Sequence, residues 1–196
     1  RLGSKSSVDL NNISLTGVKG QNSTGIELSD SKARMNAIKS SNHSCVITLK
    51  NESDVEFVGG NTHTDDKEII KVVVATGEKP SAIKDDTNQY LQTSQGTQGG
   101  TGTQEIYYGF FETKEVNTVD ELITAVSQSN RIINLNQDIE LKEELQISGQ
   151  NVIINGNNRT ITLAEGKKIT IKSTATGSKI SKVKIKGYTS QGLLVY

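Results

Sequence analysis

The chain has 196 residues, and its 22 Lys and Arg residues balance 22 Asp and Glu residues, so the formal net charge is zero. A neutral chain gives no electrostatic reason to expect nucleic acid or an anionic membrane as a partner. Abundant Gly, Ser, Thr and Asn suit short strands between turns and disfavour a helical bundle. No apolar run is long enough to span a bilayer.

Residues 1–94 predict a series of short strands. Alternating apolar residues are interrupted at Asn11–Asn12, which predicts two strands joined at a corner, because Asn tolerates the left-handed backbone conformation. Further strands are expected within residues 24–30, 33–41 and 45–61. Residues 33–41 also allow a helical turn, but the flanking Ser and Asn favour a strand. The run Ile69–Val74 is the most β-prone, and such a strand needs a partner or a cover.

The composition changes after residue 94. Residues 95–104 are Gly, Thr, Gln and Ser, which predicts a flexible linker before residues 105–196. Thr118 is then expected to be the N-cap of a short amphipathic helix, with Glu121 completing a capping box. The aromatic residues just before it (Tyr107, Tyr108, Phe110 and Phe111) are expected to pack this cap.

Residues 131–163 follow the predicted helix and predict a coil of short strands. Aliphatic runs are separated by Asn, Gly and Gln at intervals too short for crossover helices. Winding such strands into stacked turns buries their apolar side chains. The expected fold is therefore all-β: a right-handed parallel β-helix, or solenoid, with a short capping α-helix.

The order of these parts along the chain is unusual. A capping helix belongs at the start of a solenoid, yet it follows the linker, and the strands before the linker look like later turns. We therefore predict a circularly permuted chain, in which residues 105–196 followed by 1–94 form one domain and 95–104 join the original ends. Two alternatives stay open: a boundary cut through two tandem modules, and two separate β domains on a linker.

Residues 116–163 carry a family resemblance. Leu135-Asn-Gln-Asp-Ile139 ends one strand after the helix, and the turn INGNNRTITL (Ile154–Leu163) follows. These motifs resemble the pectate-lyase-like right-handed β-helix domains of bacterial cell-surface adhesins and polysaccharide lyases. The resemblance implies a secreted or cell-surface bacterial protein. In this turn we expect Gly156 and the neighbouring Asn residues to form a tight corner, with Asn side chains stacked into ladders.

Few residues predict catalysis. A lyase of this kind would need clustered carboxylates for calcium and a basic residue to abstract a proton. The acidic pairs Asp65–Asp66 and Asp85–Asp86 read as solvated turns, and His43 and His63, twenty residues apart, lack a third metal ligand. The only cysteine, Cys45, is expected to be a small buried hydrophobe. We assign no catalytic residue, no metal ligand and no cofactor, and leave calcium open.

The expected binding residues are lysines that alternation turns outward on nearby strands. They are Lys168, Lys172, Lys182, Lys184 and Lys186. Such a strip suits an acidic polysaccharide or a host glycan, although charge runs of this kind more often form a solvated, edge-protecting face. We expect a non-enzymatic surface adhesin or binding module. The alternatives are a uronate lyase-like enzyme and a structural stalk, natural or engineered. Open solenoid ends also predict self-association.

Overall fold

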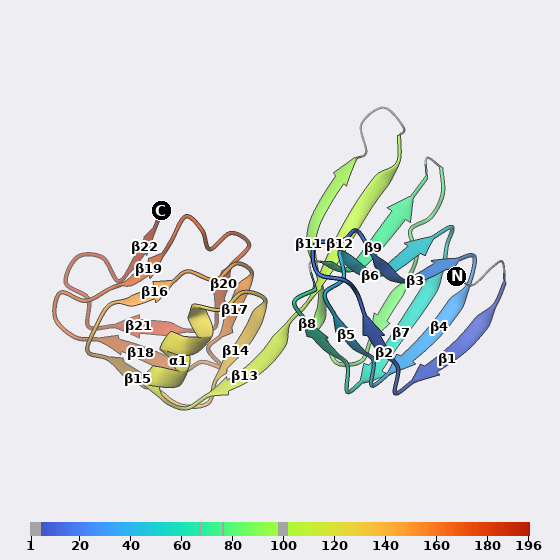
Figure 1. Ribbon diagram of the computed structural model, residues 1–196. Coiled ribbons are helices and arrows are strands. Elements are labelled where there is room, and N and C mark those ends of the chain that lie inside the picture. The colour runs from blue at the N-terminus through green and yellow to red at the C-terminus, as the bar shows by residue number, and fades with distance from the viewer. Residues whose placement is uncertain (1–4, 67, 76, 98–101) are drawn as a thin grey trace. The chain divides into compact units, whose positions relative to one another are not determined.

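The computed structural model describes residues 5–66, 68–75, 77–97 and 102–196, which form two compact units, residues 1–110 and 111–196. Each unit is a coil of short strands stacked in parallel sheets, a β-solenoid, and each is described by itself (Figure 1). The predicted all-β solenoid with one short helix is therefore confirmed. The predicted permutation concerns the placement of the two units together, and it stays a prediction.

Unit 1 has three sheets along its coil. The first contains β1 (Ser7–Asn11), β4 (Lys32–Asn36), β7 (Asp54–Gly59) and β10 (Ile83–Asp85). The second contains β2 (Ser14–Thr16), β5 (Lys39–Ser41) and β8 (Thr62–Thr64). The third contains β3 (Thr24–Ser29), β6 (Cys45–Lys50) and β9 (Glu68–Val74), followed by the antiparallel strands β12 (Gln104–Phe110) and β11 (Tyr90–Thr97).

Unit 2 also has three sheets, all parallel. The first contains β13 (Glu112–Val116), β14 (Arg131–Leu135), β17 (Val152–Asn155) and β20 (Lys179–Ser181). The second contains β15 (Ile139–Leu141), β18 (Thr160–Leu163) and β21 (Lys184–Lys186). The third contains β16 (Leu145–Ile147), β19 (Ile169–Ile171) and β22 (Leu193–Val195). The helix α1 (Val119–Val126) lies between β13 and β14 in the chain.

The cores are columns of aliphatic side chains, because alternate residues of each strand point inward. In unit 2, Ile133, Ile154 and Ile180 occupy matching positions on successive turns. In unit 1, Ala33 and Met35 of β4 are buried with Ile38, which confirms a strand rather than a helical turn in residues 33–41. Cys45 is also buried, as predicted.

The structure differs from the predicted linker. Residues 95–97 belong to β11 and residue 104 to β12, while residues 98–101 lie outside the described residues. The free edge of β9 explains the difference, since it pairs with β12, and β12 pairs with β11. The predicted need of residues 69–74 for a partner is thereby confirmed. The two units meet in the chain between Phe110 and Phe111, not at residues 95–104.

The aromatic residues around this boundary are also placed differently. Tyr108 and Phe110 pack against the core of unit 1, so the prediction that they pack the cap is wrong. The capping helix itself is confirmed. The Thr118 hydroxyl accepts a hydrogen bond from the Glu121 backbone N–H, and the Glu121 carboxylate accepts from the Thr118 N–H.

The corner at Ile154–Leu163 has a different physical basis from the predicted one. Asn157 and Asn158, with φ of 49° and 63°, make the left-handed turn, whereas Gly156 does not have positive φ. Glycine is required at position 156 for a steric reason, because a Cβ there would lie 2.3 Å from Val183 Cγ2 on the next turn. An Asn pair does form at this corner, as Asn155 donates to the Asn134 side chain of the preceding turn at 3.4 Å.

Candidate binding surface

The structure divides the predicted lysine strip of unit 2. Lys184 and Lys186 are exposed on β21, and Lys182 occupies the corner before it with a φ of 54°. Lys168 and Lys172 flank β19 in a different sheet and are partly buried. The fold thus keeps Lys182, Lys184 and Lys186 together on one turn and moves the other two lysines to another face.

A second charged surface lies on the outer face of the first sheet of unit 1. Parallel pairing aligns one outward residue from each of four strands: Asp9, Arg34, Glu56 and Lys84. Their signs alternate along the row, which we call the charged ladder. Neighbouring strands in a sheet are about 4.8 Å apart, so the ladder presents a charged group at each turn of the coil.

Three members of the charged ladder are joined by ion pairs. Lys84 Nζ lies 2.5 Å from Glu56 Oε1, and Arg34 Nε lies 3.6 Å from Glu56 Oε2. The hydrogen bond from Lys84 lowers the pKa of Glu56, and the same bond raises the pKa of Lys84. Both groups therefore stay charged near neutral pH. Their side chains remain partly accessible, 65% for Lys84 and 32% for Glu56.

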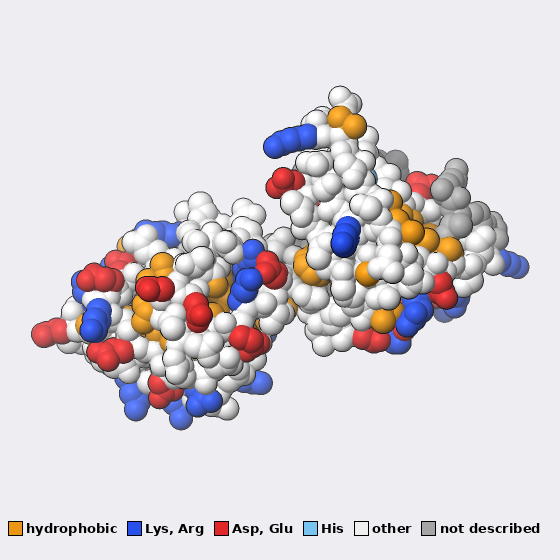
Figure 2. Space-filling view, turned by 60° about the horizontal axis from the view of Figure 1, so that its bottom comes forward, with side chains coloured by type: hydrophobic (Ala, Val, Ile, Leu, Met, Phe, Trp, Pro, Cys, Tyr) orange, Lys and Arg blue, Asp and Glu red, His pale blue; other side chains and the backbone are white. Residues whose placement is uncertain are grey.

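The charged ladder lines a shallow hollow of about 480 Å³. Lys32 and Asp54, which pair at 3.1 Å on the same face, also line it. Acidic and basic side chains are likewise interspersed over the visible surface of the molecule rather than separated by sign (Figure 2). The hollow offers donors and acceptors at short intervals, the arrangement that a hydroxyl-rich ligand requires.

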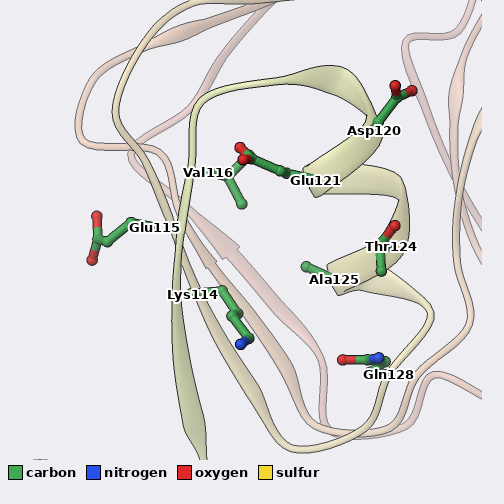
Figure 3. Close-up of a pocket in the computed structure, with 8 residues that line it drawn as sticks. All are labelled: Lys114, Glu115, Val116, Asp120, Glu121, Thr124, Ala125 and Gln128. Carbon is green, nitrogen blue, oxygen red and sulfur yellow. The ribbon is translucent and has the colours of Figure 1, made fainter.

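Unit 2 contains a different pocket, between β13 and the capping helix α1, with a volume of about 400 Å³. Lys114, Val116 and Ala125 point into this space, whereas Glu115 and Asp120 point away from it (Figure 3). Lys114 takes the position that Ile133 holds one turn later. Its ammonium pairs with Glu112 on the same strand. The pocket is thus the seam between the cap and the first turn.

The residue types of a catalytic triad do meet in unit 1, but in the interior. Ser40 Oγ lies 2.6 Å from His63 Nδ1 and donates to Asp66 Oδ2 at 2.5 Å. His63 Nε2 lies 2.9 Å from the Tyr90 hydroxyl. A neutral His63 with its proton on Nδ1 satisfies this series of hydrogen bonds: Tyr90 donates to Nε2, and Nδ1 donates to Ser40.

This buried cluster is built to join turns of the coil. The His63 and Asp66 side chains are only 3% and 0% exposed. A triad serine is bonded to one imidazole nitrogen and the carboxylate to the other, whereas here Ser40 contacts both partners. Asp66 is therefore not the predicted solvated turn residue. It accepts from Ser40 and from the His43 backbone N–H at 2.8 Å, so burial is offset by hydrogen bonds.

In the ranges given above, no three His, Cys, Asp or Glu side chains are grouped so as to hold a metal ion. Within those same ranges, the chain has no helix with the length and apolar character needed to cross a bilayer.

Sequence reasoning missed both the charged ladder and the buried cluster. The ladder residues are 25, 22 and 28 positions apart, so no fixed repeat marks them. Charged residues alternating with less exposed ones in β1, β4, β7 and β10 are the local signal. Such alternation shows which side chains face outward but not which strands are neighbours.

Comparison with protein families, with curated proteins and with solved structures finds no match for this chain.

Proposed function

We propose that this chain is a non-enzymatic binding module of a secreted or bacterial cell-surface protein, and that it presents a solenoid face to a polysaccharide. The observation that carries the proposal is the charged ladder of unit 1, which crosses four strands over a shallow hollow. The adhesin-like motifs in residues 116–163 support the same assignment.

The chemistry of the charged ladder suits a sugar polymer. The Arg34 guanidinium presents a planar set of donors that matches a carboxylate or a pair of hydroxyls, and Glu56 supplies acceptors. Because the groups recur on successive turns, an extended ligand contacts several turns at once. Such repeated contacts raise affinity without any one contact being strong.

Two features favour binding over catalysis. Removing a proton next to a uronate requires a base whose pKa is near the working pH. The hydrogen bond to Glu56 instead raises the pKa of Lys84, which keeps its proton. The residues of nucleophilic type, Ser40 and His63, are enclosed in the core of unit 1 and are bonded to other turns.

The test is binding to two polymers, measured by isothermal titration calorimetry: soluble polygalacturonate, which is acidic, and a neutral glucan. The double variant Arg34→Ala/Lys84→Ala should weaken binding roughly tenfold or more, which corresponds to about 1.4 kcal/mol. The matched control, Lys184→Ala/Lys186→Ala on β21 of unit 2, should leave the affinity unchanged.

Other outcomes would replace the proposal. Loss of binding only in Lys184→Ala/Lys186→Ala would move the site to the lysines of unit 2. Release of an unsaturated uronate, followed by its ultraviolet absorbance, would establish the lyase-like alternative. Failure of the wild-type chain to bind either polymer would favour the structural stalk.

A further inference from the structure

Each solenoid unit has two terminal turns, and among the described residues only one of the two is covered by other parts of that unit. The first turn of unit 2 lies under α1, whose Leu122, Ala125 and Val126 are buried. At the last turn of unit 1, β12 and β11 continue the sheet beyond β9, and Tyr90 stacks on Phe57. A cap at a terminal turn is what a repeat fold needs to stay soluble.

The last turn of unit 2 is finished differently. Its three strands, β20, β21 and β22, each lie at the edge of their sheet. The inward side chains of β22 stay accessible: Leu193 is 42% exposed and Val195 is 64% exposed, whereas Ile169 on the preceding turn is 1% exposed. In the part of the chain that the structure describes, nothing pairs with the outer edges of these strands.

The first turn of unit 1 has the same character. Its strands β1, β2 and β3 are also edge strands. Leu10 and Ile13 are only partly buried, whereas Met35 and Ile38 on the next turn are 0% and 1% exposed. Six large hydrophobic side chains are exposed among the described residues, and five of them lie in or beside these two turns: Tyr188, Leu193, Val195, Tyr196 and Val18. The sixth, Ile123, is on α1.

The two uncovered turns share one local pattern. In unit 2, the inward residues Ile180, Val183 and Ile185 enclose a corner at Lys182, whose φ is 54°. In unit 1, Leu10, Ile13 and Leu15 have the same spacing around a corner at Asn12, whose φ is 55°. Equal spacing and equal corner geometry mean that one turn can lie on the other with the inward side chains in line.

We propose that the last turn of unit 2 stacks on the first turn of unit 1 in a second copy of this chain, head to tail. β20 then pairs in parallel with β1, and β21 with β2, so that the solenoid continues across the contact. In this register Ile180 faces Leu10 and Ile185 faces Leu15. The same register places Lys179 opposite Asp9, so the outward charges are complementary.

The covalent connection between the units favours a second copy over the chain's own other end. Phe110 ends β12 at the last turn of unit 1, and Phe111 precedes β13 at the first turn of unit 2. The predicted permutation is one continuous stack within a chain, and it would put these consecutive residues at opposite ends, roughly 34 Å apart at the usual strand spacing. The head-to-tail contact is therefore proposed in place of that permutation. A peptide bond spans about 3.8 Å between Cα atoms. Contact between copies has no such constraint.

We call the first turn of unit 1 the head and the last turn of unit 2 the tail. A head-to-tail contact is heterologous, so an assembly of any length still has one free head and one free tail. Such a contact produces open-ended assemblies unless the ring closes. The molar mass should therefore rise steadily with concentration, measured by analytical ultracentrifugation, instead of stopping at a dimer.

Two variants that each block one end give the sharpest test. Val195→Asp blocks the tail at a side chain that is already 64% exposed, so the fold is retained. Leu10→Asp blocks the head, and Val8→Asp serves as a second head variant if the first disturbs folding in circular dichroism. Each variant alone should be monomeric, and an equimolar mixture of Val195→Asp with Leu10→Asp should form a 1:1 dimer. Ile123→Asp, on α1, is the matched control and should associate like the wild type.

Several results would overturn the proposal. A wild-type chain that stays monomeric at every concentration has no such contact. Association that persists in Val195→Asp places the contact elsewhere. Leu10→Asp that still dimerises by itself would show a symmetric tail-to-tail contact instead. None of these outcomes bears on polysaccharide binding, which is measured separately on the charged ladder.

Discussion

The ring of Tyr90 stacks on the ring of Phe57, with centroids 3.8 Å apart and an angle of 18° between the planes. Phe57 is 0% exposed and Tyr90 is 5% exposed. Tyr90 is the first residue of β11 and Phe57 belongs to β7, so the stack ties the antiparallel hairpin to the solenoid core.

Tyr90→Ala should destabilise unit 1 by about 3–5 kcal/mol, since it leaves a cavity against Phe57. Tyr90→Phe keeps the stack but removes the hydroxyl bonded to His63, and should cost about 1–3 kcal/mol. Urea unfolding gives the free energies, and hydrogen exchange of individual peptides shows which unit opens. Equal losses in the two variants would mean that the ring packing contributes nothing beyond the hydrogen bond.

His63 should make unit 1 sensitive to acid. Burial lowers its pKa to about 4, against the opposing effect of Asp66. The unfolded chain binds a proton below its ordinary pKa of about 6.5, whereas the folded chain binds one only below about 4. The contribution of neutral His63 to the stability of unit 1 is therefore fully present above pH 6.5. It is lost as the pH drops towards 4, by on the order of 3 kcal/mol.

The control for this pH dependence is His63→Gln, which has no proton to gain in that range. The difference in unfolding free energy between wild type and His63→Gln should shrink as the pH falls from 7 to 4. A constant difference would show that His63 titrates alike in the folded and unfolded chains.

Gly156 should tolerate no side chain. A Cβ there would lie 2.3 Å from Val183 Cγ2 and 2.5 Å from the Lys182 carbonyl oxygen. Gly156→Ala should therefore force two turns apart and destabilise unit 2 by about 1–3 kcal/mol. Gly96→Ala is the matched control, because nothing lies within 4 Å of the added Cβ, and it should change stability by less than about 0.5 kcal/mol. Thermal unfolding of both variants decides the comparison.

Thr118→Ala should loosen the cap of unit 2. The Thr118 hydroxyl accepts from the Glu121 N–H at 3.2 Å, and removing this N-cap acceptor costs about 1 kcal/mol. Thr118→Ser, which keeps the oxygen, should restore most of the loss. Hydrogen exchange at the amides of α1 is the measurement, and equal exchange in Ala and Ser variants would show that the capping bond is not what holds the helix.

Local features of the sequence were enough to predict the elements. The alternation around Met35 identified β4, and the Thr118–Glu121 pair identified the start of α1, because periodicity and capping depend on residues a few positions apart. The corner at Asn12 followed from the tolerance of Asn for positive φ.

Features that depend on neighbouring turns were not predictable. Residues 95–97 and 104 have no apolar pattern, yet they form strands because β9 offers a free edge. Asp66 reads as a solvated turn residue, yet Ser40 and His43 from an earlier turn bond it in the interior. Gly156 reads as a flexible corner, yet it is needed because Val183 approaches it from the next turn.

The sequence by itself determined that this chain is a coil of short strands, with Asn at its corners and one capped helix. The tertiary structure alone decided which strands are neighbours, and hence the alignment of Asp9, Arg34, Glu56 and Lys84 into one row. The physical reason is that the lengths of the connecting loops do not determine which residues of two strands are paired. Paired strands are joined by connections of unequal length, and only the packing of the inward side chains fixes the register in which outward charges meet.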